Sequence, residues 1–209
     1  MARLTDIGNV LTVPKRIFTE TVDLWKSVRE ELSRLGDDAD LNHFDVSQII
    51  NMHALFSTTK FCGDVSLWDV SNVEIMEAMF SYTKFNGSLD LWDTSNLINS
   101  SRMFHKSDFD GHGIEKWDVR NVKYAQMMFS MSNFNSDISG WNLEGIIDMS
   151  YMFFGTPLVY SMEPLVKYVR LITDVTSILD DTKAYKYPRN VFNNQRKKLL
   201  KEETPNPTI

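Results

Sequence analysis

Hydrophobic and polar positions recur along this chain with a spacing of 24 or 25 residues between positions 44 and 158. Three large apolar columns keep this register through five units. The first contains Phe44, Trp68, Trp92, Trp117 and Trp141, the second contains Phe56, Phe80, Phe104, Phe129 and Phe153, and the third contains Phe61, Phe85, Phe109, Phe134 and Leu158. A constant period in this length range is the sequence signature of a repeat architecture.

Within one unit the apolar spacing changes, and each spacing predicts a different element. Met76, Met79 and Phe80 stand at i, i+3 and i+4, which favours a short helix. Residues 85–92 begin with a turn and continue with an alternating pattern that favours a strand. One strand and one short helix match the leucine-rich-repeat length class, whereas a propeller blade needs about 40 residues. We therefore predict an α/β, leucine-rich-repeat-like solenoid of five strand-plus-short-helix units, with the Trp, Phe and Met columns buried between neighbouring units.

An asparagine column follows the Trp-Asp step, where the chain must turn. It contains Asn72, Asn96 and Asn121, while Gln48 and Gly145 occupy the position in the first and last units. Asparagine side chains at a repeated bend hydrogen-bond backbone groups that the bend leaves free, so we expect this column to serve the backbone.

The two ends depart from the repeat and predict helical caps. The N-terminal stretch between Pro14 and Gly36 carries apolar residues at three- or four-residue steps: Phe18, Val22, Trp25, Val28, Leu32 and Leu35. A second helix is expected from about residue 161 to residue 180, with Leu165, Val169, Ile172 and Leu179 on one face. The predicted organisation is an N-terminal segment and capping helix (1–43), the five-repeat solenoid (44–158), and a C-terminal capping helix with a basic tail (159–209).

Composition supports a folded chain. The sequence has 209 residues, of which 43% are hydrophobic, and this excludes wholesale disorder. No apolar run approaches the roughly 18 residues of a transmembrane helix, and the first residues lack the apolar core of a secretory signal. We therefore expect no transmembrane segment and an intracellular or virion location.

Charge is distributed unevenly along the chain. Residues 44–158 carry a net charge of −7 and residues 159–209 one of +3. Acidic repeats disfavour nucleic acid and favour a basic partner. The tail carries five cations and no acid between positions 189 and 201: Arg189, Arg196, Lys197, Lys198 and Lys201. They form either a solvated tail helix or a contact for an acidic surface, a membrane or nucleic acid.

The amino-acid sequence of the repeat also resembles that of a known family. The segment 68–73 reads Trp-Asp-Val-Ser-Asn-Val and is followed by Met76, Met79-Phe80 and Phe85-Asn86. This pattern is similar to the BspA-like leucine-rich-repeat proteins, including the repeat domain of mycoplasma surface lipoproteins, with members in protists and large DNA viruses. The resemblance covers roughly residues 14–158. It implies a repeat fold and a role in binding or adhesion, and it supplies no catalytic residues.

Candidate sites for chemistry are few. The four histidines, His43, His53, His105 and His112, fall at different repeat positions, so stacking does not gather them. The stretch 108–113 suggests an oxygen-rich metal loop, but the twelfth position of an EF-hand starting at Asp108 would be Val119 rather than Glu. A one-residue insertion in this 25-residue unit is the simpler interpretation. Cys62 is the single cysteine and has no base beside it in the sequence. We expect a non-enzymatic protein without cofactor or metal.

The predicted strands offer a surface for binding. Side chains alternate between the two faces of a strand, so we expect one row of mostly polar and acidic residues to face outward: Asp64, Ser66, Ser88, Asp90, Gly113, Glu115, Asp137 and Ser139. A solvated strand face is the alternative interpretation of this row. Our leading hypothesis is a structural or accessory component of a larger assembly such as a virus particle, with coat or capsid proteins as partners. The alternative is an adhesin or recognition module that binds a host protein or glycan through the acidic sheet face.

Overall fold

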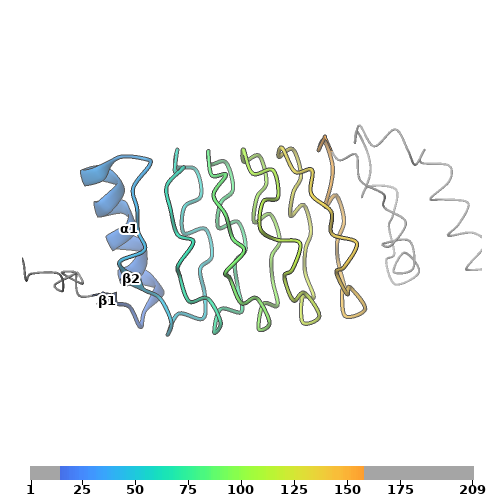
Figure 1. The fold of residues 1–209 in the computed structure, drawn as a ribbon, viewed down its shortest axis with the longest axis horizontal. Helices are drawn as coiled ribbons and strands as arrows, with labels where there is room; N and C mark the ends of the chain where they lie inside the picture. The colour runs from blue at the N-terminus through green and yellow to red at the C-terminus, as the bar shows by residue number, and fades with distance from the viewer. Residues whose placement is uncertain (1–14, 158–209) are drawn as a thin grey trace, which may run out of the picture.

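The computed structural model describes residues 15–157. Three regular elements open this part of the chain: β1 (Arg16–Ile17), α1 (Thr21–Leu35) and β2 (Phe44–Asp45). β1 pairs with β2 in parallel, with Arg16 opposite Phe44. Beyond β2 the chain runs in successive turns that lie side by side along one axis, with α1 at one end (Figure 1). The predicted C-terminal helix, Leu158 and the basic tail lie outside the described residues.

Equivalent positions of successive turns are backbone neighbours. Single parallel bridges connect one column through all the turns: Asn51 to Ile75, Ile75 to Asn99, Asn99 to Tyr124, and Tyr124 to Asp148. A further bridge joins Asp40 to Asp64. The residues that recur at 24 or 25 positions in the sequence therefore lie next to one another in space.

Each turn is built differently from the predicted strand and short helix. Among the described residues after β2, the backbone forms consecutive turns and isolated bridges instead of helices or strands. Ala78 and Tyr82 have positive φ angles of 55° and 59°. A residue in the left-handed region ends a right-handed helix, so Met76, Met79 and Phe80 share an interior side without forming a helical turn. The same two columns are left-handed in every turn: Ala54, Ala78, Arg102, Met127 and Tyr151, and four residues later Thr58, Tyr82, Lys106, Met131 and Gly155.

One set of hydrogen bonds between neighbouring turns forms a ladder with a single direction, while other backbone bonds, such as that from Ile98 to Glu74, run the opposite way. The N–H of Met76 donates to the carbonyl of Asn99 at 2.9 Å, and three more N–H groups of the same turn follow at every second residue. These are Ala78 to Ser101, Phe80 to Met103, and Tyr82 to His105. Each described pair of neighbouring turns from Met52 onward repeats the set, always with donors on the earlier turn and acceptors on the later one.

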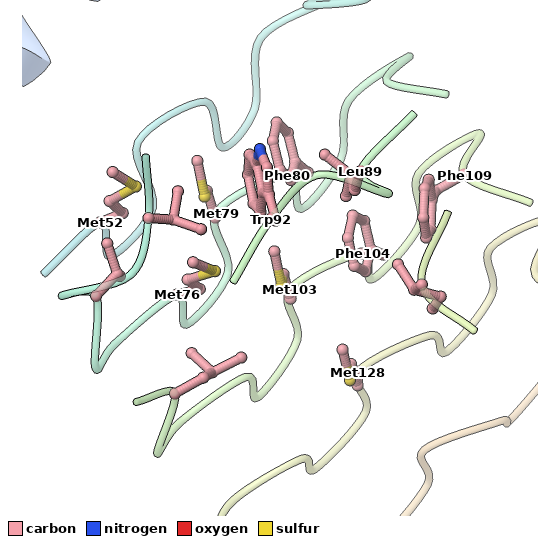
Figure 2. Packing of buried hydrophobic residues seen from close by; sticks show 14 of the residues in the cluster. Met52, Met76, Met79, Phe80, Leu89, Trp92, Met103, Phe104, Phe109 and Met128 are labelled. Carbon is pink, nitrogen blue, oxygen red and sulfur yellow. The ribbon is translucent and has the colours of Figure 1, made fainter. Parts of the chain in front are cut away.

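The interior is a stack of aromatic rings and methionines, as predicted from the columns. Phe56, Phe80, Phe104 and Phe129 are completely buried, and the Phe80 and Phe104 rings stack 5.6 Å apart at 6°. Figure 2 shows these two rings beside Trp92 and the methionines that line the interior. Within each of the first four turns a second ring stacks on the first, as Phe85 does on Phe80 at 4.1 Å. Burial of the described Trp and Phe columns, with Met79, Met103, Met128 and Met152, is confirmed.

α1 is present where the sequence predicts a helix, and the predicted apolar face is partly right: Phe18 and Val28 are buried and Leu32 packs against the core. Leu24 and Val28 are buried, whereas Val22 is 62% and Trp25 is 43% exposed, and Leu35 is also exposed. Two polar contacts fix the rotation of α1 on the first turn. The Thr21 hydroxyl donates to the carbonyl of Asn51 at 2.7 Å, and the Arg29 guanidinium donates to the carbonyl of Ser57 at 3.3 Å. The first turn offers backbone acceptors, so α1 presents donors beside its apolar residues.

Candidate protein-binding surface

The predicted binding row lies on the surface, though in turns rather than in strands. Asp64, Asp90, Glu115, Asp137 and Ser139 are exposed, and Ser66 and Ser88 are half-buried. The outward position expected for Gly113 is wrong, because this residue is buried. Gly113 has a φ of +90°, and a Cβ built on it would lie 2.6 Å from the backbone nitrogen of Asp90. The inserted residue of this unit is therefore accommodated by bringing the backbone inward.

Carboxylates of this row hold their own turns together. Asp64 accepts the backbone N–H of Ser66 at 2.8 Å, and Asp137 accepts that of Ser139 at 2.9 Å. Burial alone would raise the pKa of Asp64, but the hydrogen bonds from Ser66 bring the pKa below its usual value. A hydrogen bond from the Ser88 hydroxyl lowers the pKa of Asp90. With lowered pKa values, Asp64 and Asp90 stay ionised and carry negative charge at neutral pH.

A second acidic row follows the Trp column and was not predicted from the sequence. Its four members each accept the backbone N–H of the residue two positions on: Asp45, Asp69, Asp93 and Asp118. The repeated Trp-Asp step was the available signal, because aspartate before a turn commonly bonds the backbone two residues ahead. The Asn column serves the same corner, since Asn96 Nδ2 donates to the carbonyl of Ser71 at 2.7 Å. Its predicted backbone role is confirmed.

Two leucines stand out on this acidic surface. Leu67 and Leu91 occupy the same position in neighbouring turns and are 59% and 64% exposed. Between them lies an open hollow of about 270 Å³, and its lining includes Asp69 and Asp93. The leucine side chains thus make part of the hollow apolar, and the carboxylates of Asp69 and Asp93 make the neighbouring part acidic. This surface was not predicted from the sequence. Leu67 and Leu91 are single apolar residues in a polar stretch, and each stands directly before a buried tryptophan.

Counter-charges are unevenly distributed along the turns. Lys84 pairs with Asp108 at 3.3 Å, and Arg120 pairs with Asp118 at 2.7 Å and lowers its pKa through hydrogen bonds. Within residues 15–157, no salt bridge involves Asp69 or Asp93. The hollow between Leu67 and Leu91 therefore has free negative charge for a basic ligand group.

No cluster of three or more His, Cys, Asp or Glu side chains with metal-binding geometry occurs among residues 15–157. His105 is half-buried with Nδ1 3.0 Å from the carbonyl oxygen of Ser130, and its burial lowers the pKa of the imidazole. Cys62 is exposed, and partial burial together with Asp38 and Asp37 raises the pKa of its thiol. A raised thiol pKa disfavours the nucleophilic thiolate.

The predicted tail contact of Arg189, Arg196, Lys197, Lys198 and Lys201 lies outside the described residues. Within the described part, no helix has the length and apolarity that crossing a bilayer requires.

These features define a repeat protein whose neighbouring turns pair in parallel and whose side surface is acidic. A family model described as "Mycoplasma protein of unknown function, DUF285" matches residues 26–130 and again residues 84–192. The chain belongs to this family. A search of curated proteins and a search of solved structures each returned no match.

Proposed function

We propose that this protein is a leucine-rich-repeat-like solenoid of the BspA-like type that acts through protein contact rather than catalysis. In this proposal it is a structural or accessory component of a larger assembly such as a virus particle, within the cell or particle that makes it. The hollow between Leu67 and Leu91 is the observation that carries the proposal. Two leucines that are 59% and 64% exposed at equivalent positions are costly to leave in water, and a partner that covers them removes that cost.

The chemistry of the hollow defines the partner. The hollow combines apolar contact from Leu67 and Leu91 with the carboxylates of Asp69 and Asp93, which form no salt bridge within residues 15–157. This combination fits a protein segment with an apolar side chain flanked by Lys or Arg. Nucleic acid and anionic membranes are repelled by the same carboxylates. Coat or capsid proteins with such a basic segment are the partners expected for the assembly role.

The test compares partner binding by matched surface variants. Leu67→Lys combined with Leu91→Lys should release the partner that crosslinks to the wild-type protein in its native source. Ile147→Lys is the control, since Ile147 is 58% exposed but lies away from the hollow. Unfolding curves of all three proteins should agree, because exposed positions contribute little to stability. Retained binding by the double leucine variant would remove the hollow from the proposal.

An adhesin or recognition module is the second candidate. The exposed acidic row of Asp64, Asp90, Glu115 and Asp137 favours it, together with the mycoplasma family match. Charge reversal of Asp90 and Glu115 to Lys should abolish binding to a host protein or glycan and leave the Leu67–Leu91 contact intact. Loss of both activities in the same variant would instead indicate general damage to the surface.

A further inference from the structure

The last described turn presents a row of backbone donors that meet no acceptor within residues 15–157. In each earlier pair of turns, four N–H groups of one turn donate to four carbonyls of the next. The equivalent groups of the last turn are the N–H groups of Met149, Tyr151, Phe153 and Gly155. Within residues 15–157 none of these four meets an acceptor. Backbone donors in protein interiors are almost always paired, so this row requires an occupant.

The apolar side chains on the interior side of the row are buried, whereas Tyr151 and Gly155 are exposed. Met149 is 2% exposed, and Met152 and Phe153 are completely buried, although no described turn lies beyond them. Earlier turns reach this burial because a following turn covers them. An apolar end face of this kind is what a capping unit of a repeat protein covers.

A second copy of the chain does not fit as the occupant. Head-to-tail stacking would bring the donor row onto the first-turn carbonyls of Asn51, His53, Leu55 and Ser57. The first and last of these already accept hydrogen bonds from Thr21 and Arg29 of α1, at 2.7 and 3.3 Å. α1 therefore closes the acceptor end of the stack.

We infer that residues 172–182 of the same chain dock on this row as a sixth turn. They carry the column residues of the preceding turn, each 26 positions later: Ile172, Val175, Ile178, Leu179 and Thr182 follow Ile146, Met149, Met152, Phe153 and Thr156. The threonine position is informative. In five turns a hydroxyl three residues after the Phe donates back to the carbonyl of that Phe, from Thr59, Thr83, Ser107, Ser132 and Thr156. Thr182 stands three residues after Leu179.

The ladder assigns the register. Each donor meets the carbonyl of the residue just before its equivalent in the next turn, as Ala125 meets Asp148. This rule pairs Met149, Tyr151, Phe153 and Gly155 with the carbonyls of Asp174, Thr176, Ile178 and Asp180. The second match of the family model extends to residue 192 and includes this segment. The segment that connects the last described turn to the sixth turn is also long enough. Thr156 and Ile172 are 16 residues apart, whereas the equivalent residues of the preceding connection, Ser132 and Ile146, are 14 apart.

The sixth turn and the helix predicted from the sequence differ in which of two residues, Thr176 or Ile178, lies on the apolar side. In the helix, Thr176 shares the apolar face of Ile172 and Leu179, and Ile178 points away from it. In the sixth turn, Ile178 joins the Met column and Thr176 joins a polar column. Four members of that column, His53, Glu77, Gln126 and Ser150, are half-buried or exposed, and Ser101 is 9% exposed. Substitutions at these two positions therefore separate the two arrangements.

The experiment measures amide hydrogen exchange of residues 149–155 in the full chain. Ile178→Asp should accelerate exchange of the Phe153 and Tyr151 amides by about tenfold or more, because the acceptors leave the donor row. Thr176→Asp should leave these rates within about twofold of wild type. Acceleration by Thr176→Asp, alone or in both variants, would overturn the inference, and so would unchanged rates in both.

A cysteine pair provides a measurement that does not depend on how Ile178→Asp folds. Tyr151→Cys with Ser177→Cys, in a chain carrying Cys62→Ser, places cysteines at equivalent positions of neighbouring turns. Such positions lie about 5 Å apart, within reach of a disulfide. Mild oxidation should give an intramolecular disulfide, and the offset pair Tyr151→Cys with Asp174→Cys should form far less. An intermolecular disulfide would identify a second copy as the occupant, and no disulfide would show that the segment does not dock there; either result overturns the inference.

Closure at both ends has a consequence beyond the proposed function. With the acceptor end covered by α1 and the donor end by residues 172–182, the chain does not polymerise end to end. A partner must then bind along the side of the stack, where the hollow between Leu67 and Leu91 lies.

Discussion

The indole N–H of Trp92 donates a hydrogen bond of 3.1 Å to the carbonyl of Val65, 27 residues earlier and one turn back. The same bond recurs down the column, from Trp68 to Leu41, Trp117 to Leu89, and Trp141 to Ile114. Each tryptophan thus fills the interior and satisfies a buried carbonyl of the preceding turn. A column of phenylalanines would provide the volume without the hydrogen bond.

Replacement of Trp92 should separate these two contributions. Trp92→Ala leaves a cavity in a column residue that is 4% exposed, and it should lower the free energy of unfolding by about 3 to 5 kcal/mol. Trp92→Phe keeps most of the ring but removes one of the two hydrogen bonds that the Val65 carbonyl accepts, since the N–H of Trp68 also donates to it at 3.1 Å, and it should cost roughly 0.5 to 1.5 kcal/mol. Urea unfolding followed by circular dichroism measures both. The exposed neighbour Leu91→Ala is the control, with an expected change under about 0.5 kcal/mol.

Two glycines should respond in opposite directions to the same substitution. Gly113 has a φ of +90°, and an added Cβ would lie 2.6 Å from the nitrogen of Asp90 and 2.8 Å from that of Leu89. Gly113→Ala should therefore destabilise the protein by more than about 1 kcal/mol. An added Cβ at Gly140 has its nearest neighbour, the carbonyl oxygen of Glu115, at 4.0 Å. Gly140→Ala should be neutral or stabilising by up to about 1 kcal/mol, as measured by thermal unfolding.

The asparagine column should behave as a row of backbone hydrogen bonds. Asn96→Ala removes the donor to the Ser71 carbonyl and should cost about 1 kcal/mol. Asn96→Asp should cost more at neutral pH than at pH 3, because its carboxylate would face a carbonyl oxygen when ionised. Glu74→Ala is the matched control, since Glu74 is exposed in a neighbouring turn. Equal stability of Asn96→Ala and wild type would show that water replaces this bond without cost.

Stability should fall in acid through the turn carboxylates. The Ser47 hydroxyl lowers the pKa of Asp45, and hydrogen bonds from Arg120 lower that of Asp118. A depressed folded-state pKa means that the unfolded chain binds protons first, so the contribution is present above the unfolded value near 4 and is lost as pH falls through the folded value. Urea midpoints measured from pH 6 to pH 2 should therefore decrease mainly below about pH 4. Asp45→Asn should show a smaller decrease than wild type.

The columns of the repeat could be predicted from the sequence because burial depends on residue type. Trp68, Phe80 and Phe85 lie in the interior, as their period and size indicate. The backbone between them was mispredicted for a physical reason. Met76, Met79 and Phe80 have helical spacing, yet two residues with positive φ, Ala78 and Tyr82, direct them to the same side without a helix. Residue type does not reveal that conformation, since neither position is a glycine.

The surface was predicted less well than the core. Asp64 and Asp90 are exposed as expected, but their turn hydrogen bonds depend on a backbone that the sequence did not reveal. Leu67 and Leu91 form a common hollow only because equivalent turns lie side by side. Their exposure could not be read from a pattern in which most leucines are buried.

By itself the sequence determined which residues repeat, which of them are large and apolar, and therefore what the interior contains. The tertiary structure decided how the backbone carries them, because hydrogen bonds such as that from Met76 to Asn99 form only when one turn lies on the next. It also decided the rotation of α1, where the acceptors of Asn51 and Ser57 select the face with Thr21 and Arg29 over the face with the most apolar residues. Pairing of backbone groups is a long-range requirement, and no local pattern of side chains encodes it.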